Sequence, residues 1–128
     1  MQNYCGAVKS DDLLSEGLRA LDDLRKHEAA ALYACNPHDL IRVQEVLNIL
    51  TNADLVIHSC LARKASSKQL QFTRLDYPDI DPPEWHKFVT VRRDRDGVKT
   101  GSVPIDYYGN LPENYERYNA DYLKETVR

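Results

Sequence analysis

The feature that most restricts the fold of this chain is a short break at Asn36-Pro37 between two long helical patterns. Before the break, from Ser10 to Ala34, leucines recur every three or four residues, which is the spacing of one helix face. After it, Asn36 can cap a helix whose first turn tolerates Pro37, and apolar residues keep the same spacing to about Lys64. Because the connection is short, the two helices are predicted to form an antiparallel hairpin.

The second predicted helix is apolar around a wide arc. Two stripes lie side by side on it: Leu40, Val43, Leu47, Leu50, Ile57 and Leu61 in one, and Val46, Ile49, Ala53, Val56 and Cys60 in the other. Such an arc needs more than one neighbouring element, so we expect a third helical element to complete a three-helix, spectrin-repeat-like bundle. The side chains expected to be buried together are Leu21, Leu24, Leu47, Leu50, Ile57 and Leu61.

The sequence changes character after Lys68. Prolines and acidic residues through Asp81-Pro82-Pro83 predict an irregular loop. Phe88–Val91 and Val98–Val103 are rich in β-forming residues and flank an Asp-Gly pair, which predicts a short β-hairpin. From Pro112 onward, tyrosines at helical spacing are compatible with a short surface helix or with an extended tail.

These patterns predict a mainly α fold in one domain. Residues 1–69 form the helical bundle, and residues 70–128 form the acidic loop, the β-hairpin and a C-terminal tail that pack on the bundle. A chain of 128 residues is long enough for one such core and too short for two.

Charge and hydropathy exclude several classes of protein. The 17 basic and 20 acidic residues give a net charge of −3 and are spread evenly, which argues against a nucleic-acid-binding arm. The longest apolar stretch, Ala29–Cys35, is far shorter than the roughly 20 residues of a membrane-spanning helix, and no secretory leader pattern opens the sequence. Three widely spaced cysteines, Cys5, Cys35 and Cys60, cannot all pair within the chain. We therefore expect a cytoplasmic protein that neither spans a membrane nor binds nucleic acid.

The sequence contains no common catalytic or cofactor motif, such as a Gly-rich phosphate loop or a Gly-x-Ser-x-Gly turn. Cys35 and His38 lie three residues apart, and His58 and Cys60 two apart. Residues two apart on a helix point in different directions, so these spacings do not indicate a metal site. Cys60 lies on the apolar stripe and is most simply a small core residue. We expect no catalytic residue and no metal ligand in this chain.

Cations and hydroxyls cluster in Ala62–Lys68, at the end of the second helix. Favourable interaction with the helix dipole is one explanation for the cations. The segment Leu61–Ser67, followed by Arg74–Pro78 and Trp85–Val89, also resembles the C-terminal region of the fumarate reductase and succinate dehydrogenase flavoprotein family. Ala65 and Ser67 replace a glutamate and an arginine of that family, and Lys68-Gln69-Leu70 replaces its Gly-Ala-His. The length from Arg63 to Asp76 is similar to that in the adenylylsulfate reductase α subunit.

The resemblance implies a piece of a longer FAD-dependent oxidoreductase. In that family, FAD lies in a Rossmann-like domain toward the N-terminus, so this piece would hold no cofactor, be inactive alone, and pack against the FAD domain near an iron–sulfur subunit that takes part in electron transfer. Met1–Gly6 reads as the last turn of a helix, which agrees with that expectation. The resemblance makes Arg63, Ser66 and Arg74 the candidates for cofactor binding or for facing the FAD domain or the partner. The alternative is a free-standing helical adaptor that binds a partner helix through its apolar arc.

Overall fold

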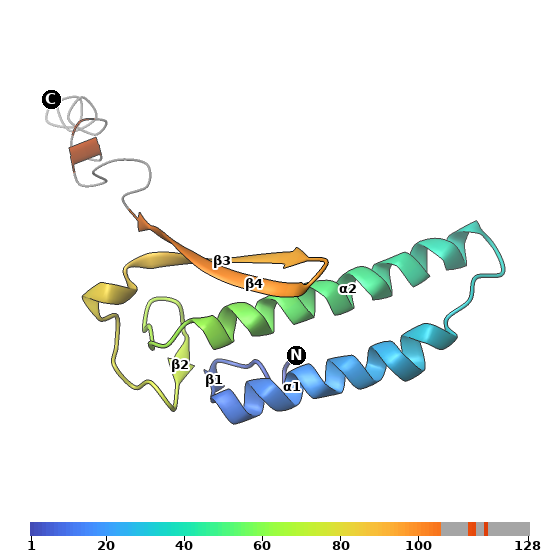
Figure 1. Cartoon of the computed structure of the whole chain (residues 1–128), viewed down its shortest axis with the longest axis horizontal. Coiled ribbons are helices and arrows are strands. Elements are labelled where there is room, and N and C mark those ends of the chain that lie inside the picture. Colours follow the sequence, from blue (N-terminus) through green and yellow to red (C-terminus); the bar gives the residue numbers. More distant parts are fainter. Residues whose placement is uncertain (106–112, 115–116, 118–128) are drawn as a thin grey trace, which may run out of the picture.

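The computed structural model describes residues 1–105, 113, 114 and 117. Two helices lie side by side with opposite directions, and a two-stranded antiparallel sheet lies along the second of them (Figure 1). The elements are β1 (Val8–Lys9), α1 (Asp11–Asp23), the π-helical turn η1 (Leu24–Glu28), the 3₁₀ turn η2 (Ala29–Ala31), α2 (Pro37–Ala62), β2 (Thr73–Arg74), the 3₁₀ turn η3 (Pro83–Trp85), β3 (Lys87–Asp94) and β4 (Gly97–Pro104).

Both helices begin where the sequence predicts. The Ser10 side chain accepts a hydrogen bond from the backbone N–H of Leu13 at 3.3 Å, and the Asn36 side chain accepts one from Asp39 at 2.9 Å. These bonds satisfy N–H groups that have no partner within the helix. The second helix ends at Ala62, two residues before the predicted end. The predicted helical hairpin is present.

The first predicted helix is not continuous to Ala34. Regular α-helix ends at Asp23, and in η1 the N–H of Ala29 bonds to the carbonyl of Leu24, five residues back. This wider turn carries Arg25, whose guanidinium donates to the backbone carbonyl of Leu50 on α2 at 3.0 Å. A contact with the other helix thus accompanies the change of helix type, and no local pattern in the sequence signals it.

The core lies between the helices. It consists of Leu14, Leu21, Leu50, Ala53 and Ile57. Leu21, Leu50 and Ile57 were predicted to be buried and are, and Leu61 packs against the cluster. The prediction is wrong for Leu24 and Leu47, whose exposed fractions are 44% and 38%. Because α1 ends before Leu24, the two helices do not face each other there as regular stripes.

The third layer is a β-hairpin where a third helix was expected. In residues 1–105, β3 and β4 pair in antiparallel register, with Phe88 opposite Val103, and cover one face of α2 (Figure 1). Gly97 closes the turn with a φ of +119°, as the Asp-Gly pair predicts. The hairpin covers only part of the apolar arc of α2, because Val46, Ile49 and Val56 of that arc remain exposed. The tail predicted from Pro112 lies mostly outside the described residues.

A small parallel sheet links the two ends of the helical hairpin. Val8 pairs with Thr73 and Lys9 with Arg74, which ties the segment before α1 to the loop after α2. At the N-terminus, the N–H of Cys5 bonds to the carbonyl of Met1 at 2.7 Å and closes a single backbone turn, which is not part of a helix in the described residues. No sequence pattern predicted the parallel pair, because its strands are two residues long and 65 positions apart.

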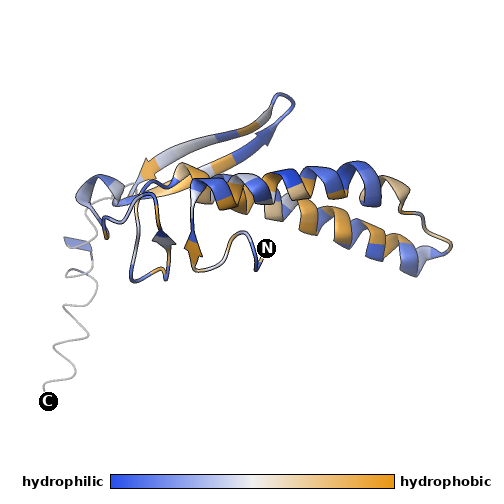
Figure 2. Cartoon of the chain, turned by 90° about the horizontal axis from the view of Figure 1, so that it is seen from below, coloured by the Kyte–Doolittle hydropathy of each residue, from blue (hydrophilic) through white to orange (hydrophobic). Residues whose placement is uncertain are grey.

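Apolar side chains also remain on the surface. Figure 2 shows apolar positions on α2 toward the loop that joins the helices, and Ile41 and Ile49 in that half are 60% and 63% exposed. Of the helices in the described part of the chain, none is long and apolar enough to cross a membrane.

Candidate functional site

Arg74 is the centre of the most connected polar cluster among the described residues, and its side chain is fully buried. Its Nη1 atom donates to the backbone carbonyls of Cys60 and Arg63, the latter at 2.9 Å. These carbonyls lie at the C-terminal end of α2, where the helix itself provides no donor. The guanidinium therefore caps α2 from a strand that lies 11 residues beyond Arg63.

The same guanidinium contacts the beginning of α1. Its Nη2 atom donates to Asp11 Oδ1 and lies 3.4 Å from Asp76 Oδ2. The backbone N–H of Asp11 in turn donates to Asp76 at 2.6 Å, and the ring of Tyr77 lies 5.1 Å from the guanidinium carbon. One buried cation thus joins the first turn of α1, the end of α2 and the loop that follows β2.

Ser66 closes that loop. Its hydroxyl oxygen accepts from the backbone N–H of Arg74 at 2.9 Å, and the hydroxyl donates to the carbonyl of Tyr77 at 2.8 Å. Its backbone pairs with the segment around Ile80 through bonds to Asp79 and Asp81, each 2.9 Å. Because the side chain and backbone are both used, Ser66 fixes the path of the loop from residue 66 to residue 81.

Arg63 lies at the rim of the cluster, with its side chain 13% exposed. Its guanidinium lies 5.9 Å from the rings of both Phe72 and Trp85 and 3.8 Å from Asp81. Its Nε atom is buried and has no hydrogen-bond partner. Aromatic faces and one carboxylate therefore hold the cation loosely, and one donor remains free.

The structure thus brings the three predicted residues, Arg63, Ser66 and Arg74, into one cluster. The side chains of Ser66 and Arg74 are directed at groups of this chain, and they organise the loop from within. That they bind a cofactor or face another domain remains a prediction. The sequence did not indicate that Asp11 belongs to this cluster, nor Lys9, which is buried with its Nζ 4.1 Å from the centre of the Phe72 ring.

The outer side of this loop is apolar. Leu70, Leu75 and Ile80 are each 66% exposed. Phe72, Leu75, Pro78 and Ile80 line an open cavity of about 270 Å³, and Ser66 and Arg74 lie at its base. We call Leu70, Leu75 and Ile80 the loop surface. A rigid loop that presents apolar side chains is suited to packing against another folded surface.

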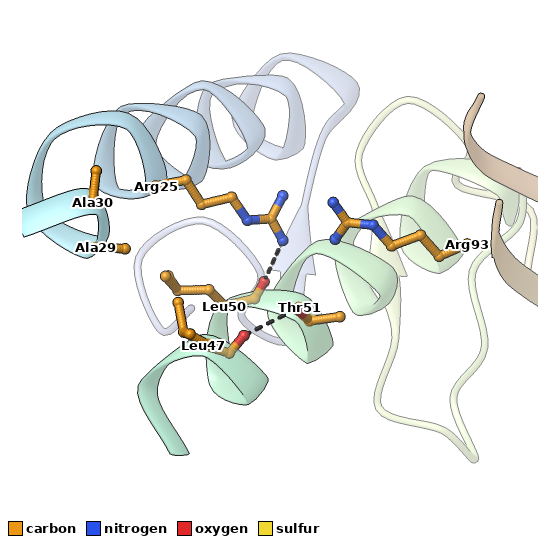
Figure 3. Close-up of a pocket in the computed structure, with 7 residues that line it drawn as sticks. All are labelled: Arg25, Ala29, Ala30, Leu47, Leu50, Thr51 and Arg93. Carbon is orange, nitrogen blue, oxygen red and sulfur yellow. Dashed lines mark hydrogen bonds between the residues drawn. The ribbon is translucent and has the colours of Figure 1, made fainter. Parts of the chain in front are cut away.

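A second charged cluster surrounds Asp54, which is 8% exposed on α2. Its carboxylate lies 3.3 Å from Arg25 of η1, 3.6 Å from Arg93 of β3 and 3.5 Å from His58. Figure 3 shows Arg25 and Arg93 approaching from different elements beside an open pocket of about 430 Å³. The cluster joins the three layers, and the sequence could not reveal it because the position of β3 was unknown.

Metal binding has no visible basis in the part of the chain that the structure describes, where no three His, Cys, Asp or Glu side chains converge. Phosphate binding at the helix N-termini is also disfavoured. Ser10 and Asn36 already cap them, and Asp11, Asp12 and Asp39 place negative charge in their first turns. The contacts of Arg74 with α1, with the end of α2 and with the loop after β2 are suited to shaping the surface of that loop.

Comparison with known proteins gives a consistent result. The family profile described as fumarate reductase flavoprotein C-term matches residues 1–126. Succinate dehydrogenase flavoprotein subunits of Rickettsia bellii and Rickettsia felis are 25% identical over 114 residues, which is 84% of this chain and 18% of each relative. A solved mutant of the E. coli quinol fumarate reductase FrdA is similar in fold, with a TM-score of 0.72 and 23% identity over 82% of this chain and 19% of that one. The chain spans less than a fifth of the length of these proteins.

Proposed function

The chain belongs to the fumarate reductase flavoprotein C-terminal family, and from this membership we propose that it is the domain that supports the FAD-binding domain of a longer FAD-dependent oxidoreductase. In this proposal FAD belongs to the other domain, where it supplies the electron-transfer chemistry. The present domain contributes a docking surface and is inactive alone.

The observation that carries the proposal is the burial of Arg74 beneath an exposed apolar loop. A fully buried guanidinium that caps α2 and pairs with Asp11 fixes the loop before any partner arrives. The loop surface then exposes three large apolar side chains at 66% each. An ordered surface loses little conformational entropy on docking, which favours tight packing. Arg63 supplies a partly exposed cation at the rim for an acidic group or a backbone carbonyl of the FAD domain.

We assign Arg63, Ser66 and Arg74 different roles in this interface. Arg63 contacts the neighbouring domain, while Ser66 and Arg74 hold the loop that contacts it. Contact with an iron–sulfur subunit and a cytoplasmic location are part of the same proposal. The three cysteines, which are all free, are consistent with a reducing compartment.

The substrate branch that we propose is the adenylylsulfate reductase type. It rests on the length of the segment from Arg63 to Asp76. Oxidation of sulfite in the presence of AMP, measured beside oxidation of succinate, distinguishes the two branches. Activity with succinate alone would contradict the assignment of the branch and leave the docking role intact.

The docking role is tested with the protein expressed from its complete reading frame. We expect a yellow protein with bound flavin, and we expect the triple change of Leu70, Leu75 and Ile80 to Ser to lower its flavin content. Ile41→Ser is the matched control, because Ile41 is 60% exposed but lies at the other end of α2. Equal flavin content in the triple variant, the control and the wild type would contradict the proposal.

A free-standing adaptor is the second candidate, and the exposed apolar half of α2 around Ile41 and Ile49 favours it. The two candidates differ in the length of the reading frame. A frame that continues upstream through a Gly-x-Gly-x-x-Gly motif after a predicted strand supports the flavoprotein. A stop codon directly upstream of Met1 supports the adaptor.

A further inference from the structure

Two cysteines from distant parts of the chain lie in contact. The sulfur atoms of Cys5 and Cys60 are 3.5 Å apart, although 55 positions separate the residues. Both side chains are partly buried and pack against the core cluster between the helices. The docking role proposed above uses neither thiol, so this pair requires its own explanation.

The fold holds Cys5 in place. Tyr4 lies so close to Gly17 of α1 that a Cβ atom at position 17 would be 2.8 Å from the Cβ of Tyr4. The turn from Met1 to Cys5 and the β1–β2 pair fix the two sides of this short segment. Cys60 lies in the last turn of α2, and its carbonyl is capped by Arg74. Both thiols are therefore positioned by independent contacts.

The distance is suitable for a covalent link. A disulfide has an S–S length of about 2.05 Å, so the two sulfur atoms need to approach by about 1.5 Å, which small side-chain rotations supply. Cys35 is exposed in the loop that joins the helices. It is separated from Cys60 by nearly the whole of α2, which is roughly 36 Å at 1.5 Å per residue. Within one chain, Cys5 and Cys60 are thus the pair that can react.

We propose that Cys5 and Cys60 are a peroxide-responsive modification site that forms an intramolecular disulfide. In the first step the Cys5 sulfur attacks a peroxide ROOH, the O–O bond breaks, and Cys5 sulfenic acid and ROH are formed. In the second step the Cys60 sulfur attacks the sulfenic sulfur, the S–O bond breaks, and the hydroxyl leaves with the Cys60 proton as water. The two thiols together lose two electrons, and the peroxide gains them.

The surroundings assign the order of the steps. Burial, with the neighbouring Cys5, raises the pKa of the Cys60 thiol from 9.0 to about 12, while Lys9 and Arg74 act in the opposite direction. Cys60 therefore holds its proton at neutral pH and is the poorer first nucleophile. It is suited to the second step, where the sulfenic sulfur is already in contact with it. The disulfide fixes residues 1–6 to the end of α2.

The experiment treats the protein from the complete reading frame with hydrogen peroxide under denaturant-free conditions and digests it with trypsin after blocking free thiols. Cleavage at lysine and arginine gives a Cys5 peptide that ends at Lys9, a Cys35 peptide of residues 27–42 and a Cys60 peptide of residues 43–63. We expect the first and third peptides to be linked, with the loss of two free thiols, and dithiothreitol to restore both.

Three variants make the result decisive. Cys35→Ser is the matched control and should give the same yield of the linked peptides as the wild type. Cys5→Ser and Cys60→Ser should abolish the link, and circular dichroism before oxidation verifies that each is folded. In folded Cys60→Ser, Cys5 should accumulate as sulfenic acid or more oxidised forms. Linked peptides that contain Cys35, or oxidation of Cys5 in the Cys35→Ser variant without a link to Cys60, would overturn the proposal.

Discussion

Replacement of Arg74 by methionine tests whether this buried cation holds the loop in place. Methionine is unbranched and compatible with a buried site but is shorter than arginine, so the change removes the hydrogen bonds and leaves space where the guanidinium lay. Two backbone carbonyls at the end of α2, those of Cys60 and Arg63, lose their donor. Asp11 and Asp76 lose a cation, but their side chains are 44% and 36% exposed and water can solvate them.

The carbonyls therefore dominate the expected loss of stability. A fully buried acceptor left without a donor costs about 1–3 kcal/mol, and these two bonds are partly buried, so the two together cost at most about 2–6 kcal/mol. The ion pairs add little, because exposed carboxylates regain hydration. Burial of the methionine side chain offsets part of the loss. We expect the free energy of unfolding to fall by about 3 kcal/mol.

The assay is urea unfolding followed by circular dichroism. The slope of the free energy of unfolding against urea concentration is compared among the variants, because an unchanged slope means that only the stability has changed. Arg92→Met is the matched control, because Arg92 is 77% exposed and its contact with Asp94 is 3.5 Å long. It should change the stability by at most about 1 kcal/mol. Arg74→Lys should lose less stability than Arg74→Met, because the ammonium can still donate to some of these acceptors. It should not match the wild type, because an ammonium reaches fewer acceptors than the guanidinium fork. A loss of stability below about 0.5 kcal/mol for Arg74→Met would contradict the role of Arg74 in holding the loop.

Two further predictions concern Gly17 and Cys60. Gly17→Ala should destabilise the fold by about 1–3 kcal/mol in urea unfolding, because the added Cβ would lie 2.8 Å from Tyr4, and this outweighs the roughly 1 kcal/mol that alanine gains in helix propensity. Tyr4→Gly in the same chain, which removes the Cβ of Tyr4, should remove most of the penalty, and an unchanged penalty would contradict the contact. The pKa of Cys60 is raised from 9.0 to about 12 by burial, so the folded state keeps a proton that the unfolded chain releases. Its contribution to stability is present below pH 9 and is lost as the pH rises toward 12. Urea unfolding at several pH values should show that the free energy of unfolding declines as the pH rises, and that the decline is weaker in Cys60→Ala than in the wild type. An equal decline in the two proteins would contradict this contribution of Cys60.

The family was recognisable from the sequence, and the candidate residues were partly so. Arg63, Ser66 and Arg74 were selected from a resemblance in the segment that follows α2, and they form one cluster. The resemblance did not reveal that Arg74 is fully buried or that Asp11 is its partner. Asp11 is 63 positions away in the chain, and the pairing depends on the helices running antiparallel.

The elements that could be predicted from the sequence are those that local interactions fix. The caps at Ser10 and Asn36 and the turn at Gly97 each depend on residues within a few positions, so their signals are visible in the sequence. The hydrophobic spacing likewise placed Leu50 and Ile57 in the core. These contributions are short-range, and a linear pattern can encode them.

The way in which the remaining elements meet depends on contacts between segments that are distant in the chain. The β3–β4 hairpin covers α2 where a helix was expected, and α1 gives way to η1 where Arg25 bonds to Leu50. Contact between Cys5 and Cys60 and the capping of α2 by Arg74 also join segments that are far apart in the chain. The free energy of such contacts depends on how much apolar surface and how many polar groups remain uncovered once the helices have packed. Neither can be read from the order of the residues, because both depend on the positions of the packed elements.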